Sequence, residues 1–261
     1  MIYLLIHSLV PDISLSGKLE GIVKGKTRSG LLYECERIIK HCKPKYLLME
    51  NVKSLVGKRF KSQFNEWSSY LESLGYVNYW KVLNATDYGI PQSRERIFMI
   101  SILGDHKPYK FADKIPLDKC IADILEDEVD EKYYINKSFH LVNKGEGQKI
   151  ILPCICASRG RYLDNSSSGG VKKSTEQRFE FNTRGISNTI TTVQKDNYLV
   201  EQTYRIRKLT PRECFRLMGL KDDDIDKIQE TGISNAQQYK MAGNSIVVNV
   251  LEAIFRNLFL D

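Results

Sequence analysis

The sequence lacks the cysteine and histidine patterns that hold metals or build disulfide frameworks. Its six cysteines are scattered without a Cys-x-x-Cys pair, and its four histidines lie at wide intervals. These spacings support neither a zinc site nor a disulfide-stapled fold. No metal is expected, and the thiols are expected to be reduced, as they are in cytosolic proteins.

A membrane-spanning run and a secretion signal are also missing. The opening stretch 1–10 is apolar, but it has no positively charged start and no small-residue cleavage site. It is also about half as long as a membrane span needs. We therefore expect a buried strand there, no membrane partner and a cytoplasmic location.

The first hundred residues contain no glycine-rich phosphate turn of the Gly-x-Gly-x-x-Gly kind, although their pattern is that of an α/β sheet. After the first strand comes a basic loop, 12–30, and then a helix that Pro44 ends. The order strand, loop, helix, strand predicts a crossover unit of a parallel sheet. The face expected to be buried on the first helix consists of Leu31, Leu32, Cys35, Ile38 and Ile39. Further on we expect a helix at 60–74, with Phe64, Trp67, Leu71 and Leu74 on one face, and strands at 76–83 and 96–103.

The segment 104–204 has a different texture. Helical periodicity fades, Gly, Ser and basic residues cluster, and pieces such as 189–193 are typical of short strands. We interpret it as an irregular second domain with basic loops, and a set of solvated insertions is the alternative. The net charge of +7 favours a polyanionic partner.

Helices return after residue 205. Thr210-Pro-Arg-Glu213 combines a cap residue, a proline at the first helical position and a glutamate at the third. It predicts a helix through Met218 that ends at Gly219. Residues 243–245 are then expected to precede a helix at 246–259.

A carboxylate and an amide lie near the end of the apolar stretch Tyr46-Leu-Leu-Met-Glu-Asn-Val52. In an open parallel sheet, ligands bind beyond the carboxyl ends of the strands, so Glu50 is placed to touch a substrate. A glutamate on an edge strand, facing water, is the alternative for this stretch alone.

Residues 84–100 contain Gln92, Arg94 and Arg96, and this stretch resembles the Gln-x-Arg-x-Arg motif of the DNA cytosine-5 methyltransferases. Four other stretches agree with that family in order and spacing. Residues 27–34 are similar to the segment after its catalytic loop, 50–52 to its Glu-Asn-Val motif, 207–219 to its ninth motif, and 243–246 with the following helix to its tenth. The resemblance runs from about Asp12 to the end.

The resemblance implies an α/β fold with an incomplete Rossmann-like sheet of an S-adenosylmethionine-dependent methyltransferase and an inserted, mainly β target-recognition domain. It implies three segments. Residues 1–103 are the C-terminal part of the catalytic domain, 104–204 are the target-recognition domain, and 205–261 hold the ninth- and tenth-motif helices that return to the catalytic domain.

The family's chemistry gives roles to the motif residues. A thiolate adds to C6 of a flipped-out cytosine, and C5 then takes the methyl group of S-adenosylmethionine. By resemblance Glu50 stabilises the ring at N3, Arg96 acts at O2, Arg94 holds the backbone or the catalytic loop, and Gln92 orients its neighbours. Taken singly, Arg94 and Arg96 could instead be a surface ladder.

Two binding sites follow from the same resemblance. Gly243, Asn244 and Ser245 are implied to line the cofactor pocket, at a helix amino terminus whose backbone donors suit a polar ligand; a simple helix cap at Asn244 is the alternative. Double-stranded DNA is the implied substrate. The phosphate contacts are expected from basic residues of the second domain: Arg159, Arg161, Lys172, Lys173 and Arg184.

The sequence departs from the family where the nucleophile is expected. The family has a Pro-Cys-Gln loop, but Leu9-Val-Pro-Asp-Ile-Ser14 stands here and the cysteine position falls on Val10. The family's Phe-x-Gly-x-Gly strand for the cofactor is missing too. We therefore expect the isolated chain to transfer no methyl group.

Two explanations stay open at this point. The chain is a truncated, frameshifted or split methyltransferase whose partner chain carries the missing motifs, or it is a catalytically dead DNA-binding or regulatory module. A cognate restriction endonuclease in the same restriction-modification system is the further partner that the resemblance implies.

Overall fold

The computed structural model describes residues 3–7, 32–135, 153–162, 175–182, 184–192, 197–201 and 205–260, and at 3–7, 32–33, 159–162 and 175–179 it describes only the backbone. The chain forms two compact units. Unit 1 consists of Met1–Asn84, Glu95–Asp113 and Glu252–Asp261, and unit 2 of Ala85–Arg94 and Lys114–Leu251.

Unit 1 is built on a four-stranded sheet in the order β1-β2-β5-β3. The strands are β1 (Tyr3–His7), β2 (Tyr46–Val52), β3 (Tyr76–Asn84) and β5 (Glu95–Leu103). β1 and β2 are parallel, which confirms the predicted crossover unit, and β5 runs antiparallel to both β2 and β3. The helix of the crossover is α1 (Leu32–Cys42).

One face of this sheet is covered by α1 and α2 (Lys61–Ser73). Leu47 and Met49 of β2 project there, because alternate residues of a strand share a face. They meet the predicted apolar face of α2, whose Phe64, Trp67 and Leu71 are buried. On α1 the expectation was partly wrong, since Ile38 is 39% exposed.

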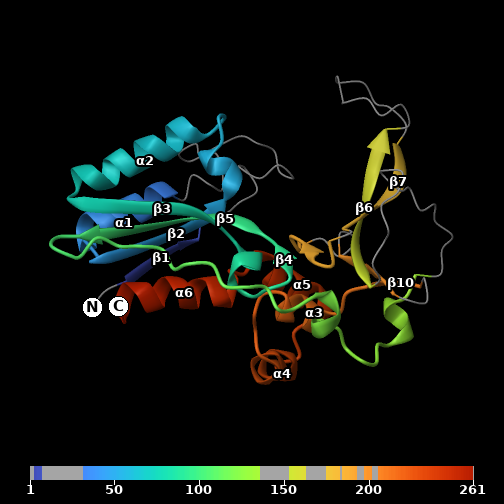
Figure 1. Ribbon diagram of the computed structural model, residues 1–261. Helices are drawn as coiled ribbons and strands as arrows, with labels where there is room; N and C mark the ends of the chain where they lie inside the picture. The colour runs from blue at the N-terminus through green and yellow to red at the C-terminus, as the bar shows by residue number, and fades with distance from the viewer. Residues whose placement is uncertain are drawn as a thin grey trace. The chain divides into compact units, whose positions relative to one another are not determined.

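The opposite face of the sheet lies against the C-terminal part of α6 (Val248–Phe259). The Tyr46 ring of β2 meets the Phe259 ring edge-on at 5.3 Å. Figure 1 shows α2 on one side of the sheet and α6 on the other. The sheet is therefore sandwiched between helices, as expected for an α/β fold.

Unit 2 contains a second sheet in the order β10-β9-β6-β7. Its strands are β6 (Cys154–Tyr162), β7 (Thr175–Phe181), β9 (Tyr198–Val200) and β10 (Ile206–Lys208), all joined in antiparallel pairs. A small core of Cys154, Cys156, Tyr198, Val200 and Ile206 lies against it. A separate short pair joins β4 (Gln92–Ser93) to β8 (Ser187–Asn188) in parallel.

The helices of unit 2 are α3 (Pro211–Arg216), α4 (Asp222–Glu230), α5 (Asn235–Asn244) and the start of α6. The predicted capping box is confirmed, with the Thr210 side chain accepting from the Glu213 N–H at 3.2 Å and the Glu213 carboxylate accepting from the Thr210 N–H at 2.8 Å. α3 ends two residues before Met218, and the chain then turns at Gly219, whose φ is +82°.

Several details differ from the sequence-based expectations. Helices α4 and α5 had not been predicted, and residues 189–192 lie outside any strand, with the short strand β8 just before them. Residues 205–251 lie in the same compact unit as 114–204, so the unit boundaries do not coincide with the predicted ones at 103 and 204. Within the described residues, none of the helices is both long and apolar enough to cross a membrane.

Candidate active site

Glu50 and Arg96 form an ion pair in unit 1. In the register of β2 with β5, Arg96 lies opposite Val52, and Glu50 is two residues before Val52 on the same face. The two side chains are therefore diagonal neighbours, within reach of long side chains. Nε of Arg96 lies 3.1 Å from Oε1 of Glu50.

The pair is asymmetric in its exposure. The Glu50 side chain is 1% exposed and the Arg96 side chain 16%. Burial lowers the pKa of Arg96, and the nearby Glu50 carboxylate opposes that effect. The carboxyl group is held out of water, and the guanidinium beside it reaches the surface. Together they can form hydrogen bonds to one edge of a flat, uncharged ligand.

Neighbouring side chains hold the pair in place. Asn51 is buried, and its Oδ1 accepts a hydrogen bond from the N–H of Val52 at 2.7 Å. Nη1 of Arg96 donates to the carbonyl of Glu95 at 2.9 Å. The Glu95 carboxylate in turn pairs with Lys53 at 2.8 Å. Nη2 of Arg96 donates to none of the described residues and stays available for a ligand oxygen.

Gln92 and Arg94 lie in unit 2 and bind backbone there. The Gln92 side chain is fully buried; its Nε2 donates to the carbonyl of Leu217 at 2.7 Å, and its Oε1 accepts from the N–H of Ile190 at 3.1 Å. Nη1 of Arg94 donates to the carbonyl of Ile190 at 3.2 Å. Both side chains thus tie together chain segments that are far apart in sequence.

The turn at 243–245 is the second anchor of Arg94. Its Nη2 donates to the carbonyls of Gly243 at 3.1 Å and Ser245 at 2.9 Å. Gly243 packs so closely that an added Cβ would lie 2.6 Å from the backbone nitrogen of Thr192. The helix expected from residue 246 is present as α6 but begins two residues later, at Val248, and the turn before it ends another helix: Asn244 is the last residue of α5 and Ser245 its C-cap.

The expected phosphate contacts fall in unit 2. Arg159 and Arg161 lie on β6, with Arg178 and Glu176 as their register partners on β7. Arg184 is exposed, and its N–H donates to Oδ1 of Asn182 at 3.0 Å. Lys172 and Lys173 lie outside the described residues, as does Val10.

The family has a nucleophilic cysteine at the position where this chain has Val10. None of the cysteines in the described part of unit 1 is placed to take over its role. Cys35 is half-buried against the core of the sheet, and Cys42 ends α1 before β2 begins, at the opposite end of β2 from Glu50. In unit 2, burial raises the pKa of Cys154 to about 11 and raises that of Cys156 and Cys214 too. Neutral, buried thiols are inert.

One strong ion pair was missed from sequence. The Arg207 guanidinium, 1% exposed, donates to both carboxylate oxygens of Glu213, which is fully buried. Nε of Arg207 also donates to Glu201 at 2.8 Å. The six-residue spacing across a strand end and a helix start is no recognised pattern, so local sequence gave no signal for this pair.

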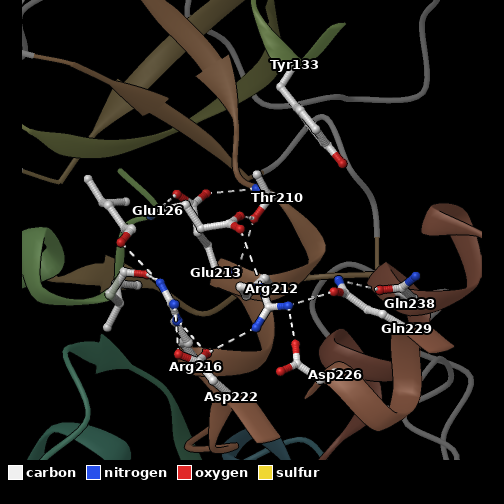
Figure 2. A network of polar contacts seen from close by, with 12 residues as sticks. Glu126, Tyr133, Thr210, Arg212, Glu213, Arg216, Asp222, Asp226, Gln229 and Gln238 are labelled. Carbon is white, nitrogen blue, oxygen red and sulfur yellow. Dashed lines mark hydrogen bonds and ion pairs between the residues drawn. The ribbon is translucent and has the colours of Figure 1, made fainter. Parts of the chain in front are cut away.

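A more exposed network continues from it along α3 and α4. Figure 2 shows Arg212 directed toward Asp226 and Gln229, with Arg216 bound to both oxygens of Asp222. The carbonyls of Ile124 and Leu125 accept from Nη1 of Arg216 at 3.2 and 3.1 Å. The arginines therefore fasten α3 to α4 and to the end of the 3-10 helix η5 (Ile121–Ile124).

Comparison with known proteins gives the family of this chain. The family model "C-5 cytosine-specific DNA methylase" matches residues 11–260. The chain belongs to this family. It is 42% identical over 250 residues to the type II methyltransferase M2.ScrFI of Lactococcus lactis subsp. cremoris, covering 95% of this chain and 64% of that protein. It is 34% identical to the orphan methyltransferase M.SssI of Spiroplasma monobiae, covering 93% and 62%.

The fold agrees with the family. The solved structure of the Entamoeba histolytica methyltransferase EhMeth is similar at a TM-score of 0.62 and 20% identity, covering 99% of this chain and 77% of that one. The fold is thus the α/β fold of the methyltransferases, as predicted. This methylase-family chain spans less than two thirds of the length of those two curated relatives.

Proposed function

We propose that this chain supplies the ring-stabilising part of a DNA cytosine-5 methyltransferase site, where a methyl group is transferred to C5 of cytosine in a specific duplex sequence. The Glu50–Arg96 ion pair carries the proposal, since it joins the residues of two family motifs at 3.1 Å on one face of the sheet. Each is placed by its strand rather than by a loop, which suits a site that must be held firmly.

The chemistry asks for groups that take up charge on the pyrimidine ring. When a thiolate bonds to C6, the electron pair of the C5–C6 double bond moves into the ring toward N3 and O2. The Glu50 carboxyl group would act at N3, and Nη2 of Arg96 would donate to O2. The electron density gathered at C5 would take up the methyl group while the bond from that methyl group to the donor's sulfur breaks. Loss of the C5 proton and of the thiol from C6 would then restore the C5–C6 double bond. Interactions that strengthen as this charge develops lower the barrier.

S-adenosylmethionine is the methyl donor that the family implies, and when bound it supplies an electrophilic methyl group. The turn at 243–245 fits it only in part. The carbonyls of Gly243 and Ser245 are occupied by Arg94, whereas the Asn244 side chain is exposed and can meet a polar ligand. We infer that Arg94 and Gln92 position this turn and the segment near Ile190, and that other cofactor contacts come from outside this sequence.

The nucleophilic thiol must also come from elsewhere, because valine stands at its position in this sequence. We propose a second chain, or a further segment of the same protein, that carries the Pro-Cys-Gln motif. Duplex DNA and, in a restriction-modification system, a cognate endonuclease are the other proposed partners. The cytoplasmic location stays a prediction from the opening segment.

The experiment mixes this chain with a fragment that carries the family's Phe-x-Gly-x-Gly and Pro-Cys-Gln motifs and follows tritiated methyl transfer to duplex DNA. Glu50→Gln should lower the transfer rate by about 10²- to 10³-fold, the usual cost of losing one transition-state donor. Glu66→Gln on α2, an exposed glutamate, is the matched control and should leave the rate unchanged.

An equal rate for Glu50→Gln and the wild type would remove Glu50 from the site. A mixture that binds DNA but transfers nothing, with any fragment that carries these motifs, would favour the alternative of a catalytically dead DNA-binding module. That alternative takes its support from the missing thiol.

A further inference from the structure

The segment that follows β2 is strongly basic. Between residues 51 and 65 the sequence contains four basic residues and no acidic one. The basic side chains are Lys53, Lys58, Arg59 and Lys61. Such a run is often only a solvated face, so the structure around it decides what it can do.

This segment is anchored at both ends. It begins with the 3-10 helix η3 (Lys53–Val56), whose Leu55 is 2% exposed, and it enters α2 through Phe60, which is 4% exposed. Between these anchors the N–H of Gly57 donates to the carbonyl of Ser54 at 3.0 Å, and the carbonyl of Gly57 accepts from the N–H of Lys61 at 3.0 Å. The lysines therefore project from a fixed turn.

Two charges of this turn lack an ion partner among the described residues. Lys58 and Lys61 are exposed and form no ion pair with any residue that the structure describes. The Arg59 guanidinium lies over the Phe60 ring at 5.5 Å, a contact that orients the group. Lys53 is the exception, since it pairs with Glu95.

The turn also lies at the end of the sheet where Glu50 and Arg96 are found. It follows β2 directly, so it starts at the strand end that carries Glu50. The Lys53–Glu95 ion pair connects its first residue to the residue next to Arg96. A duplex that delivers a cytosine to Glu50 and Arg96 would bring its phosphates close to this edge of unit 1.

We propose that Lys58 and Lys61, here called the basic turn, bind phosphates of the DNA strand beside the target cytosine. This inference rests on the proposed function, and it adds a DNA-binding surface in unit 1 to the one expected from the basic residues of unit 2. Its task is to set the position of the duplex, because phosphate contacts fix register and carry no sequence information.

The test compares DNA binding by the full chain with that of two double variants. Lys58→Ala/Lys61→Ala removes two charges from the basic turn. Lys40→Ala/Lys107→Ala removes two exposed lysines at the other end of the sheet, where α1 ends and where the chain leaves β5. The affinity for a fluorescent duplex is measured by anisotropy at a series of salt concentrations, and the fold is checked by circular dichroism.

The basic-turn variant should lower the slope of log affinity against log salt by about 1.8, since each phosphate contact contributes about 0.9. The control variant should keep the wild-type slope. Equal slopes for wild type and the basic-turn variant would overturn the proposal, and so would equal losses in both variants or a wild-type chain that binds no duplex.

Methyl transfer by the mixture described above separates this proposal from the function on which it rests. Suppose that Lys58→Ala/Lys61→Ala transfers methyl groups at the wild-type rate and with the wild-type Michaelis constant for DNA. This result would leave the proposed function intact and would reject the basic turn as a DNA contact. A slope change without any methyl transfer would keep the basic turn as a DNA contact and remove the enzyme function.

Discussion

Glu213→Ala is expected to destabilise unit 2 strongly. The Glu213 carboxylate accepts four hydrogen bonds: from Nη2 and Nη1 of Arg207 at 2.7 and 2.8 Å, from the N–H of Glu126 at 3.1 Å, and from the N–H of Thr210 at 2.8 Å. Removing it leaves the Arg207 guanidinium, 1% exposed, without its main counter-charge. Breaking a buried ion pair in this way costs about 3–5 kcal/mol.

The assay uses the thiol next to the mutated residue. Cys214 is buried, so a thiol reagent reaches it only when unit 2 opens. A loss of 3–5 kcal/mol corresponds to an increase of about two to three and a half orders of magnitude in the labelling rate, at roughly 1.4 kcal/mol per tenfold. Mass spectrometry identifies the labelled site, and fluorescence of Trp67 and Trp80 reports unit 1 separately.

Two further variants sharpen the result. Glu230→Ala, an exposed glutamate of α4, should label like the wild type. Arg207→Met/Glu213→Leu should recover part of the loss, because no unpaired charge remains, while the N–H groups of Thr210 and Glu126 still lack their acceptor. A Glu213→Ala labelling rate within threefold of wild type, or a double variant no slower than the single one, would refute the reasoning.

Two other perturbations test the fold of each unit. Burial raises the pKa of Tyr76 from its ordinary value of 10.0 to about 12. The contribution of its neutral side chain to stability is therefore fully present below pH 10 and is lost as the pH rises toward 12. Urea unfolding followed by tryptophan fluorescence should show this loss of stability, and Tyr76→Phe should reduce the loss. Gly243→Ala should destabilise unit 2 by about 1–3 kcal/mol, because the new Cβ would lie 2.6 Å from the backbone nitrogen of Thr192. Gly to Ala inside a helix usually stabilises a protein. A higher melting temperature for this variant would therefore contradict the close contact between α5 and Thr192.

Local patterns predicted the elements that depend on neighbours in sequence. The spacing of Phe64, Trp67 and Leu71 indicated the buried face of α2, and Thr210 with Glu213 indicated the start of α3. Both signals arise within one or two helical turns, where a side chain meets the backbone or the core directly.

Contacts between distant segments could not be predicted in the same way. The Glu50–Arg96 distance depends on the register of β2 with β5, and no sequence motif fixes that register. Arg94 reaches carbonyls about a hundred and fifty positions away, at Gly243 and Ser245. Gly243 was expected just before the last helix, whereas it lies inside α5, where the close approach of the Thr192 backbone explains why a glycine stands there.

The measurement that tests the central claim most directly is tritiated methyl incorporation into duplex DNA by three samples: the pure chain, the fragment that carries the Phe-x-Gly-x-Gly and Pro-Cys-Gln motifs, and their mixture. We predict incorporation at C5 of cytosine by the mixture alone, with loss of that signal in Glu50→Gln. Incorporation by the pure chain would show that it contains its own nucleophile and would contradict the account, as would a mixture that keeps its full rate with Glu50→Gln.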